Sequence, residues 1–286
     1  MKWFKTILIL LGYFITTGLH AVDSYAHDIR LSSERINEYE EHVTIAQNKS
    51  VITTIQAKNI YQTFQGDLNG DGFEELILES FSGGAHCCFQ MSILQLRPNT
   101  SKPYTFALNN AERTEFKDLD NDGIAEIITY DDRYSYFASL CFACSPFVKV
   151  IVNFDGEKLV LRPKLMEKFA RPNNKPLKVS TIGMDKLGNI ELDSTNAPEV
   201  VEVMLHDLYM GKTQSAIKTM KTYFRFEHPA LRRLFLDALV EAMSRSPFFE
   251  QVCELNGWYE HTSPKEYDKP YQIVWHFFEM FDKTKL

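Results

Sequence analysis

A short acidic loop that occurs twice constrains the fold of this chain more than any other feature. The copies read DLNGDGFEE at residues 67–75 and DLDNDGIAE at residues 118–126. In each copy, Asp or Asn stands at positions 1, 3 and 5, glycine at position 6 and a carboxylate at position 9. A hard divalent cation takes roughly six to eight oxygen ligands, and glycine allows the tight turn that lets alternate residues converge on it. The sequence therefore predicts two calcium-binding loops.

The residues that follow each loop distinguish it from an EF-hand, in which position 12 is a bidentate Glu that leads into a helix. Position 12 is Leu78 in the first copy and Thr129 in the second. Short runs of β-branched and large apolar residues follow both loops, and such runs are typical of strands. We therefore expect each loop to lead into a β-strand.

The strings DLNGDGFEELIL and DLDNDGIAEIIT resemble the FG-GAP or VCBS-type repeats of integrin-alpha-like β-propellers. Blades of that family carry the pattern D-x-[DN]-x-D-G-x-x-[DE]-[LI] between their first two strands. A closed propeller has about 4 to 8 blades, and two copies occur here, within roughly residues 59–162. The resemblance implies two calcium ions, with backbone carbonyls from Phe73 and Ile124. The full ligand sets that it implies are Asp67, Asn69, Asp71, Phe73 and Glu75, and Asp118, Asp120, Asp122, Ile124 and Glu126.

The order of apolar runs predicts an α+β chain with an N-terminal antiparallel β domain at residues 27–195. Residues 27–50 read as a short helix or an irregular lead-in, and 51–64 as β-like. Two blade-like repeats then follow, at about 59–110 and 111–162, and each reads as a four-stranded antiparallel meander because further strand-like runs follow its loop. These runs are 89–96 and 104–108 in one repeat, and 147–154 and 159–161 in the other; a hairpin is expected near 177–193.

Residues 196–286 change to a helical pattern, with apolar residues recurring at intervals of three and four. We expect helices up to Gly211, from Thr213, from Pro229, and from Pro247 to near Gly257, with a last one around residues 273–281. Short connections favour antiparallel neighbours, so this part predicts a helical domain or a helical layer on the sheet. Its many aromatic residues are read as core, or as a partner surface where they are exposed: Phe248, Phe249, Trp258, Tyr259, Tyr267, Tyr271, Trp275, Phe277 and Phe278.

The first residues have the pattern of an export signal, with a basic head and an apolar stretch too short for a membrane span. Cleavage after Ala21 or Ala26 is expected, so residues 1–26 are taken as a signal peptide. Its loss would remove Lys2, Lys5 and Asp23 and change the formal net charge from −7 to −8. An acidic chain disfavours nucleic acid and anionic membranes as partners. We expect a periplasmic or secreted protein without a membrane span.

Four of the five cysteines lie in matching places, between the middle strands of the two repeats. Cys87 and Cys88 follow His86 in the first repeat, and Cys141 and Cys144 lie in the second. Disulfides are the usual state of such cysteines outside the cytoplasm. Bridges between the two pairs would clamp the repeats together; a local Cys141–Cys144 bridge, a zinc site with His86, and reduced or redox-active thiols are the alternatives. Cys253 lies on an apolar helical face and reads as a buried thiol.

The leading functional hypothesis is an exported, disulfide-stabilised calcium-binding module that acts in interaction or structure, without catalytic activity. Its partner would be another protein or a component of the cell envelope. The alternative is a cell-envelope hydrolase that uses the calcium loops as scaffold, and a third class is a thiol or metal-handling protein. No Ser/His/Asp or paired-carboxylate pattern stands out. Glu79, Asp131 and Asp132 are expected to be solvated turn residues.

Overall fold

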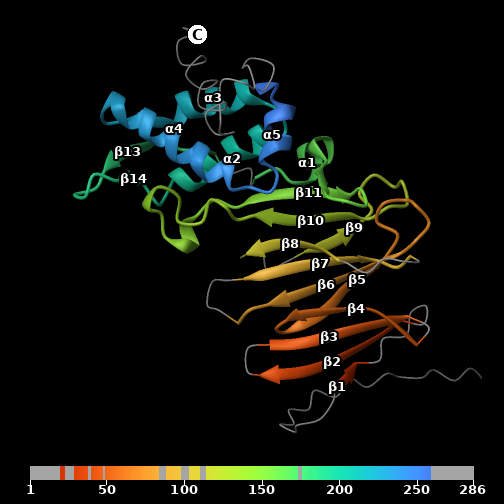
Figure 1. Ribbon diagram of the computed structural model, residues 1–286. Helices are drawn as coiled ribbons and strands as arrows, with labels where there is room; N and C mark the ends of the chain where they lie inside the picture. Colours follow the sequence, from red (N-terminus) through yellow and green to blue (C-terminus); the bar gives the residue numbers. More distant parts are fainter. Residues whose placement is uncertain are drawn as a thin grey trace, which may run out of the picture. The chain divides into compact units, whose positions relative to one another are not determined.

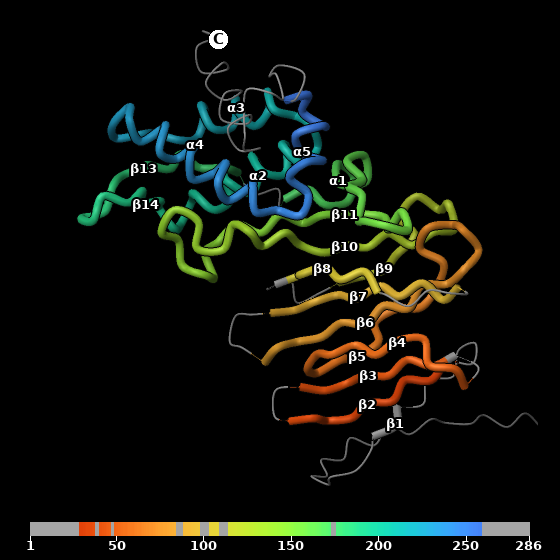
Figure 2. Tube along the Cα trace, viewed as in Figure 1, coloured from red at the N-terminus to blue at the C-terminus, as the bar shows by residue number. Residues whose placement is uncertain are grey.

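The computed structural model of the chain describes residues 20–22, 29–37, 40–47, 49–83, 88–97, 103–109, 114–172 and 176–258. Most strands precede most helices along the chain and nearly all pairings between neighbouring strands are antiparallel, which confirms the expected α+β class. The chain divides into two compact units, Met1–Ile60 and Tyr61–Leu286, whose elements are traced in Figures 1 and 2. Most of the expected signal peptide and the expected helix at 273–281 lie outside the described residues.

The first unit contains a sheet of β1 (His20–Val22), β2 (Ile29–Asn37), β3 (Glu40–Gln47) and β4 (Ser50–Ala57), in that order and with antiparallel neighbours. The expectation of a helix or irregular lead-in at 27–50 is therefore wrong. Val43 and Ile45 are both buried, and Val43 pairs with the buried Ile55. This alternation has a period of two, which is the period of a strand.

The second unit begins with the two predicted four-stranded sheets. One has the order β5 (Ile60–Gly66), β6 (Glu75–Phe81), β7 (Phe89–Gln95) and β8 (Tyr104–Asn109). The other has the order β9 (Glu115–Lys117), β10 (Glu126–Asp131), β11 (Val148–Phe154) and β12 (Leu159–Leu161). Each follows chain order, as a meander does, and the pairings from β6 to β8 and from β9 to β12 are antiparallel. The strands expected after each acidic loop are confirmed as β6 and β10.

The expected hairpin is formed by β13 (Ser180–Met184) and β14 (Ile190–Leu192). A strand that the sequence did not indicate, β15 (Phe224–Phe226), pairs with β13 in parallel. Two 3-10 turns, η1 (Phe137–Ser139) and η2 (Phe142–Cys144), lie between β10 and β11. The helices of the described residues are α1 (Pro163–Phe169), which was not predicted, and four of the five expected ones, α2 (Ala197–Tyr209), α3 (Thr213–Tyr223), α4 (Pro229–Ser244) and α5 (Phe249–Leu255).

The helices and the second sheet share one hydrophobic core. The cluster of buried residues runs without a break from Val150 and Val152 of β11 to Leu205 and Leu208 of α2, and Figure 1 draws the helices on the side of β10 and β11. Phe248, Phe249 and Trp258 are buried, as the core interpretation of the aromatic residues expects, while the expected aromatic residues from Tyr259 onward lie outside the described part of the chain. In the part of the chain that the structure describes, the buried residues of 196–258 therefore belong to the same cluster as those of β10 and β11.

Candidate metal centre

The loop between β5 and β6 is shaped by one aspartate that accepts several backbone hydrogen bonds. Asp67 Oδ1 accepts from Gly70 N at 2.7 Å, and its Oδ2 accepts from Gly72 N at 2.9 Å. Both glycines have positive φ, 75° and 86°, a backbone conformation that residues with a Cβ rarely adopt. Asp71 Oδ1 accepts from Phe73 N at 2.9 Å and completes the turn.

The loop between β9 and β10 repeats this arrangement. Asp118 Oδ1 accepts from Asn121 N at 2.7 Å, and its Oδ2 accepts from Gly123 N at 3.0 Å. Asp122 Oδ1 accepts from Ile124 N at 2.8 Å. Asn121 takes the place of the first glycine with φ 63°, which is possible because Asn tolerates the left-handed region better than most residues. Two different sequences therefore build the same turn.

A buried glutamate closes each loop from the first position of the following strand. Glu75 Oε2 accepts from Leu68 N at 2.7 Å, and Glu126 Oε2 accepts from Leu119 N at 2.8 Å. Both glutamates are fully buried. Burial, followed by the neighbouring charges of Asp71 and Asp67, raises the pKa of Glu75 to about 7, against the lowering effect of the Leu68 hydrogen bond. A bound cation would offset the cost of placing these carboxylates away from water.

The partner opposite each glutamate on the adjacent strand is an amide side chain. Glu75 pairs with Gln95 across β6 and β7, and Gln95 Nε2 donates to Glu75 Oε1 at 3.4 Å. Asn153 of β11 donates to Glu126 Oε1 at the same distance. In each glutamate, Oε2 therefore accepts a hydrogen bond from the loop and Oε1 accepts one from the adjacent strand. These two contacts set the orientation of the carboxylate.

Three of the side chains expected as ligands converge in the second loop, whereas the described residues of the first loop contain no such group of three acidic side chains. Ligand oxygens of Asp118, Asp120 and Glu126 all lie within 4.8 Å of one another. In the first loop, Asn69 Nδ2 lies 3.3 Å from both Asp71 Oδ2 and Glu75 Oε1. Carboxylate and amide oxygens are the ligands that Ca²⁺ takes in proteins, so the donor set fits this ion. The carbonyls of Phe73 and Ile124 stay predictions.

The two loops lie side by side. A Cβ placed on Gly70 would stand 2.9 Å from Ile124 Cδ1, so the first loop touches the second. A Cβ placed on Gly156, in the turn between β11 and β12, would stand 3.4 Å from Asn69 Nδ2 and 3.5 Å from Gln95 Nε2. Phe64 and Phe116, on the strands that enter the loops, stack with their ring centroids 4.7 Å apart. The two candidate sites are therefore neighbours within the second unit (Figure 2).

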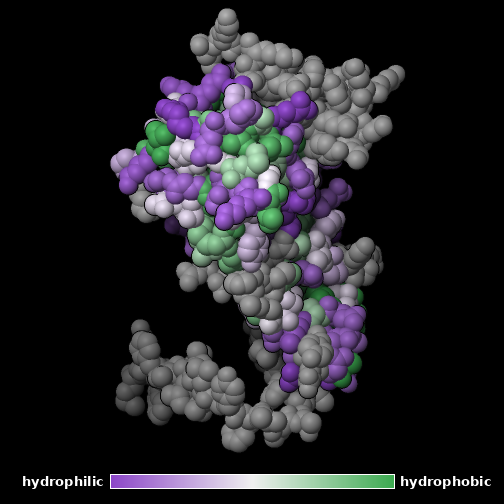
Figure 3. Space-filling view, turned by 90° about the vertical axis from the view of Figure 1, so that its left-hand side faces the viewer, coloured by the Kyte–Doolittle hydropathy of each residue, from purple (hydrophilic) through white to green (hydrophobic). Residues whose placement is uncertain are grey.

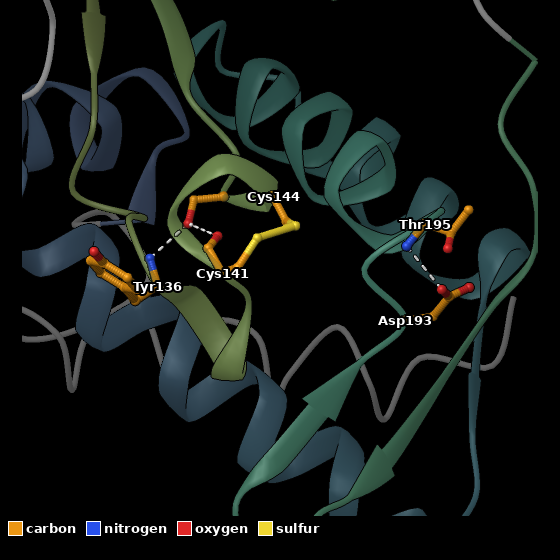
Figure 4. The surroundings of a disulfide bond; sticks show 6 residues. Tyr136, Cys141, Cys144, Asp193 and Thr195 are labelled. Carbon is orange, nitrogen blue, oxygen red and sulfur yellow. Dashed lines mark hydrogen bonds between the residues drawn. A yellow bond between two sulfur atoms is a disulfide. The ribbon is translucent and has the colours of Figure 1, made fainter. Parts of the chain in front are cut away.

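Of the disulfide pairings considered from the sequence, the structure contains the local bridge within the second repeat. Cys141 and Cys144 form a disulfide with each other, which Figure 4 shows beside the hydrogen bond from Tyr136 N to Ser145 Oγ. The expected clamp between Cys87 or Cys88 and this pair is therefore wrong, and a disulfide leaves neither thiol for zinc. Cys88 is also disulfide-bonded, whereas His86 and Cys87 lie outside the described residues. Cys253 is buried on α5, as predicted.

Three acidic residues that were expected in solvated turns are buried: Glu79, Asp131 and Asp132. Asp131 Oδ2 accepts from Tyr209 OH and from Ser246 Oγ, both at 2.5 Å, and Tyr134 OH lies 3.1 Å from Tyr209 OH. This group, called here the Asp131 network, joins β10 to α2 and to the segment before α5. Every residue of β10 except Tyr130 is buried, and the polar types of Thr129 and Asp131 gave no local sequence signal of this burial.

The titration of Asp131 should make stability depend on pH. Burial raises the pKa of Asp131, although hydrogen bonds from Ser246 and Tyr209 oppose the shift. The folded protein keeps this proton to higher pH than the unfolded chain, so the free energy of unfolding falls as pH rises from about 4 through the raised pKa. Asp131→Asn abolishes the titration.

We expect the wild type to gain stability relative to Asp131→Asn as pH falls, by at most about 1.4 kcal/mol per pH unit. Urea denaturation of both proteins with EGTA present, at about pH 5 and about pH 7.5, measures this difference. Other titrating groups contribute equally to both proteins. A difference that stays constant with pH would contradict the prediction.

No protein-family model, curated protein or solved structure matches this chain. Within the described part of the chain, none of the helices combines the length and the apolar character that crossing a lipid bilayer requires.

Proposed function

We propose that the chain is an exported, disulfide-stabilised protein that binds two calcium ions and serves as an interaction or structural module. The observation that carries the proposal is the repeated loop geometry. Two sequences with different residues at positions 3 and 4 fold into the same turn, and each directs a buried glutamate of the next strand toward its own acidic loop. The resemblance of both loops to the FG-GAP or VCBS-type pattern supports the same interpretation.

The residues that would hold the first ion are Asp67, Asn69, Asp71 and Glu75, and those for the second are Asp118, Asp120, Asp122 and Glu126. In each site the aspartates belong to the loop, whereas the glutamate belongs to the strand that follows it. A cation shared by these groups would fix the loop on that strand. Calcium would therefore contribute folding free energy, because carboxylates that repel one another in the free loop become ligands of one ion.

The proposed partner is another protein or an envelope component. On the face drawn in Figure 3, apolar residues are interspersed with hydrophilic ones.

The proposal of export rests on the pattern of residues 1–26. Because β1 lies inside this segment, cleavage after Ala26 would leave β2, β3 and β4 in the first sheet. The hydrolase alternative gains no support from Asp131, since this carboxylate is buried and already accepts two hydroxyl hydrogen bonds.

Calorimetric calcium titration of the wild type and of a matched pair of variants tests the proposal. The wild type should bind two ions, and Glu75→Gln and Glu126→Gln should each weaken one site by about tenfold or more, because each loses a charged ligand. Gln keeps the size of the side chain and can still accept from Leu68 N or Leu119 N. Glu191→Gln, on β14 and exposed, is the control and should leave both sites intact. Absence of calcium binding by the wild type would refute the proposal.

A further inference from the structure

The two loops differ in one contact that their shared pattern does not predict. Arg162, the residue between β12 and α1, extends its guanidinium into the second loop. Its NH2 group donates to Asp120 Oδ2 at 2.7 Å, and its NH1 group lies 3.5 Å from Glu126 Oε1. Both acceptors belong to the carboxylate group whose oxygens converge. A cation of the protein itself therefore already contacts two of the proposed calcium ligands.

The position of Arg162 is held by the sheet. Its backbone N donates to Ile151 O at 2.9 Å, and its guanidinium also donates to Asn153 Oδ1. Asn153 is the amide that donates to Glu126, so one hydrogen-bonded group joins the guanidinium, the amide and the buried carboxylate. Both the backbone and the side chain of Arg162 are therefore hydrogen-bonded to β11, in addition to the contact of its guanidinium with the loop.

The first repeat has an aromatic residue in the corresponding place. In the second repeat, Arg162 stands opposite Ile151 of β11, and Ile151 lies two residues before Asn153. In the first repeat, Tyr104 stands opposite Ile93 of β7, and Ile93 lies two residues before Gln95. The Tyr104 ring packs edge-on against Phe154 at 5.3 Å. The arginine that contacts the first loop is Arg97, whose guanidinium lies 3.6 Å from Asp71 Oδ2, with almost half of its side chain exposed.

The charges of the loops account for the difference. The second loop has Asp120 at position 3, where the first has the neutral Asn69. Among the proposed ligands the second set therefore has one more carboxylate, and Arg162 neutralises one negative charge directly on that extra group. The first loop has its own additional carboxylate at Glu74, which is not a proposed ligand and accepts a hydrogen bond from Gln65 Nε2. A guanidinium and a calcium ion cannot both take the same oxygens of Asp120 and Glu126 as close partners, since their positive charges repel each other.

We propose that Arg162 is an internal cation that competes with calcium for the second loop. The first loop then fills at low calcium concentration, and the second fills only when calcium displaces the guanidinium. This inference rests on the proposed calcium-binding function and adds an order of binding to it. The second site should be weaker than the first by about tenfold, the scale of one charge-assisted hydrogen bond between partly exposed groups.

Replacement of Arg162 in a protein whose first site is weakened isolates the effect. Calorimetric calcium titration compares Glu75→Gln with the double variant Glu75→Gln/Arg162→Gln, in which the second loop should bind about tenfold more tightly. Arg97→Gln in the same background is the matched control and should not tighten the second site. Should the Glu75 variant fail to fold, the two-site titration of wild type, Arg162→Gln and Arg97→Gln answers the same question.

Thermal melting gives a second readout, because the substitution should lower the melting temperature without calcium and enlarge the increase that calcium produces. Without calcium, Arg162→Gln should melt below the wild type because its carboxylates lose their internal counter-charge. In saturating calcium the increase in melting temperature should be larger for the variant than for the wild type. A wild type that binds two ions, together with an Arg162→Gln variant of unchanged or weaker second site, would overturn the inference and leave the proposed function standing. No binding by either protein would overturn both.

Discussion

In excess EGTA the protein should melt roughly 10–20 °C below its melting temperature in saturating calcium. Each site filled at about a hundred times its dissociation constant adds about 2.7 kcal/mol, and a unit of this size shifts by about 2–4 °C per kcal/mol. The physical reason is the cost of holding the aspartates of each loop and the buried Glu75 and Glu126 together without a cation. Circular dichroism followed on heating measures the shift.

The double variant Glu75→Gln/Glu126→Gln is the control for this shift. It should show about half of the wild-type response to EGTA or less, because a site weakened about tenfold adds about 1.4 kcal/mol at the same calcium concentration in place of about 2.7 kcal/mol. This difference separates site-specific binding from a general salt effect. Magnesium in place of calcium should stabilise the wild type less, since this smaller ion demands a stricter octahedral geometry. An unchanged melting temperature of the wild type in EGTA would exclude a structural role for calcium.

Asp131→Ala should lower the free energy of unfolding by about 3 kcal/mol or more. The substitution removes the acceptor of Tyr209 OH and Ser246 Oγ and leaves these hydroxyls buried without it. Arg133 N loses a partner as well, since it donates to Asp131 Oδ1 at 3.1 Å. Urea denaturation should show a lower midpoint with an unchanged slope, because the surface exposed on unfolding stays the same.

Tyr134→Phe is the graded control for the Asp131 network. The Tyr134 hydroxyl reaches the network only through Tyr209, at 3.1 Å, so its removal should cost about 1 kcal/mol. The ratio of the two effects tests whether Asp131 is the centre of the network. Equal losses for both variants, or a loss under about 1 kcal/mol for Asp131→Ala, would contradict this assignment.

The parts of the fold that could be predicted are those that local sequence determines. The turn chemistry of Asp67 with Gly70 and Gly72 lies within six residues, and the apolar runs after both loops favour strands whatever their surroundings. The helices α2 to α5 were recognised for the same reason, because their apolar spacing is an internal property of each segment. The proposed ligand side chains lie in that turn or on the first residue of the strand that follows it.

The parts that could not be predicted depend on residues far apart in the chain. Tyr209 and Ser246 meet Asp131 across 78 and 115 positions, so its hydrophilic sequence context suggested a solvated turn. The strands β2 and β3 carry many polar residues, which weakened the alternation that identifies a strand. Arg162 lies 42 positions from Asp120, and no local pattern connects them.

The parallel pairing of β13 with β15 has a consequence for the order in which the chain is made. The sheet order β14-β13-β15 leaves one side of β13 without its neighbour until Phe224–Phe226 has been synthesised and two helices have formed between them. An unpaired strand edge is a template for pairing with other chains. A nascent or truncated polypeptide that ends before Phe224 should therefore aggregate, and synthesis of β15 is what protects the open side of β13.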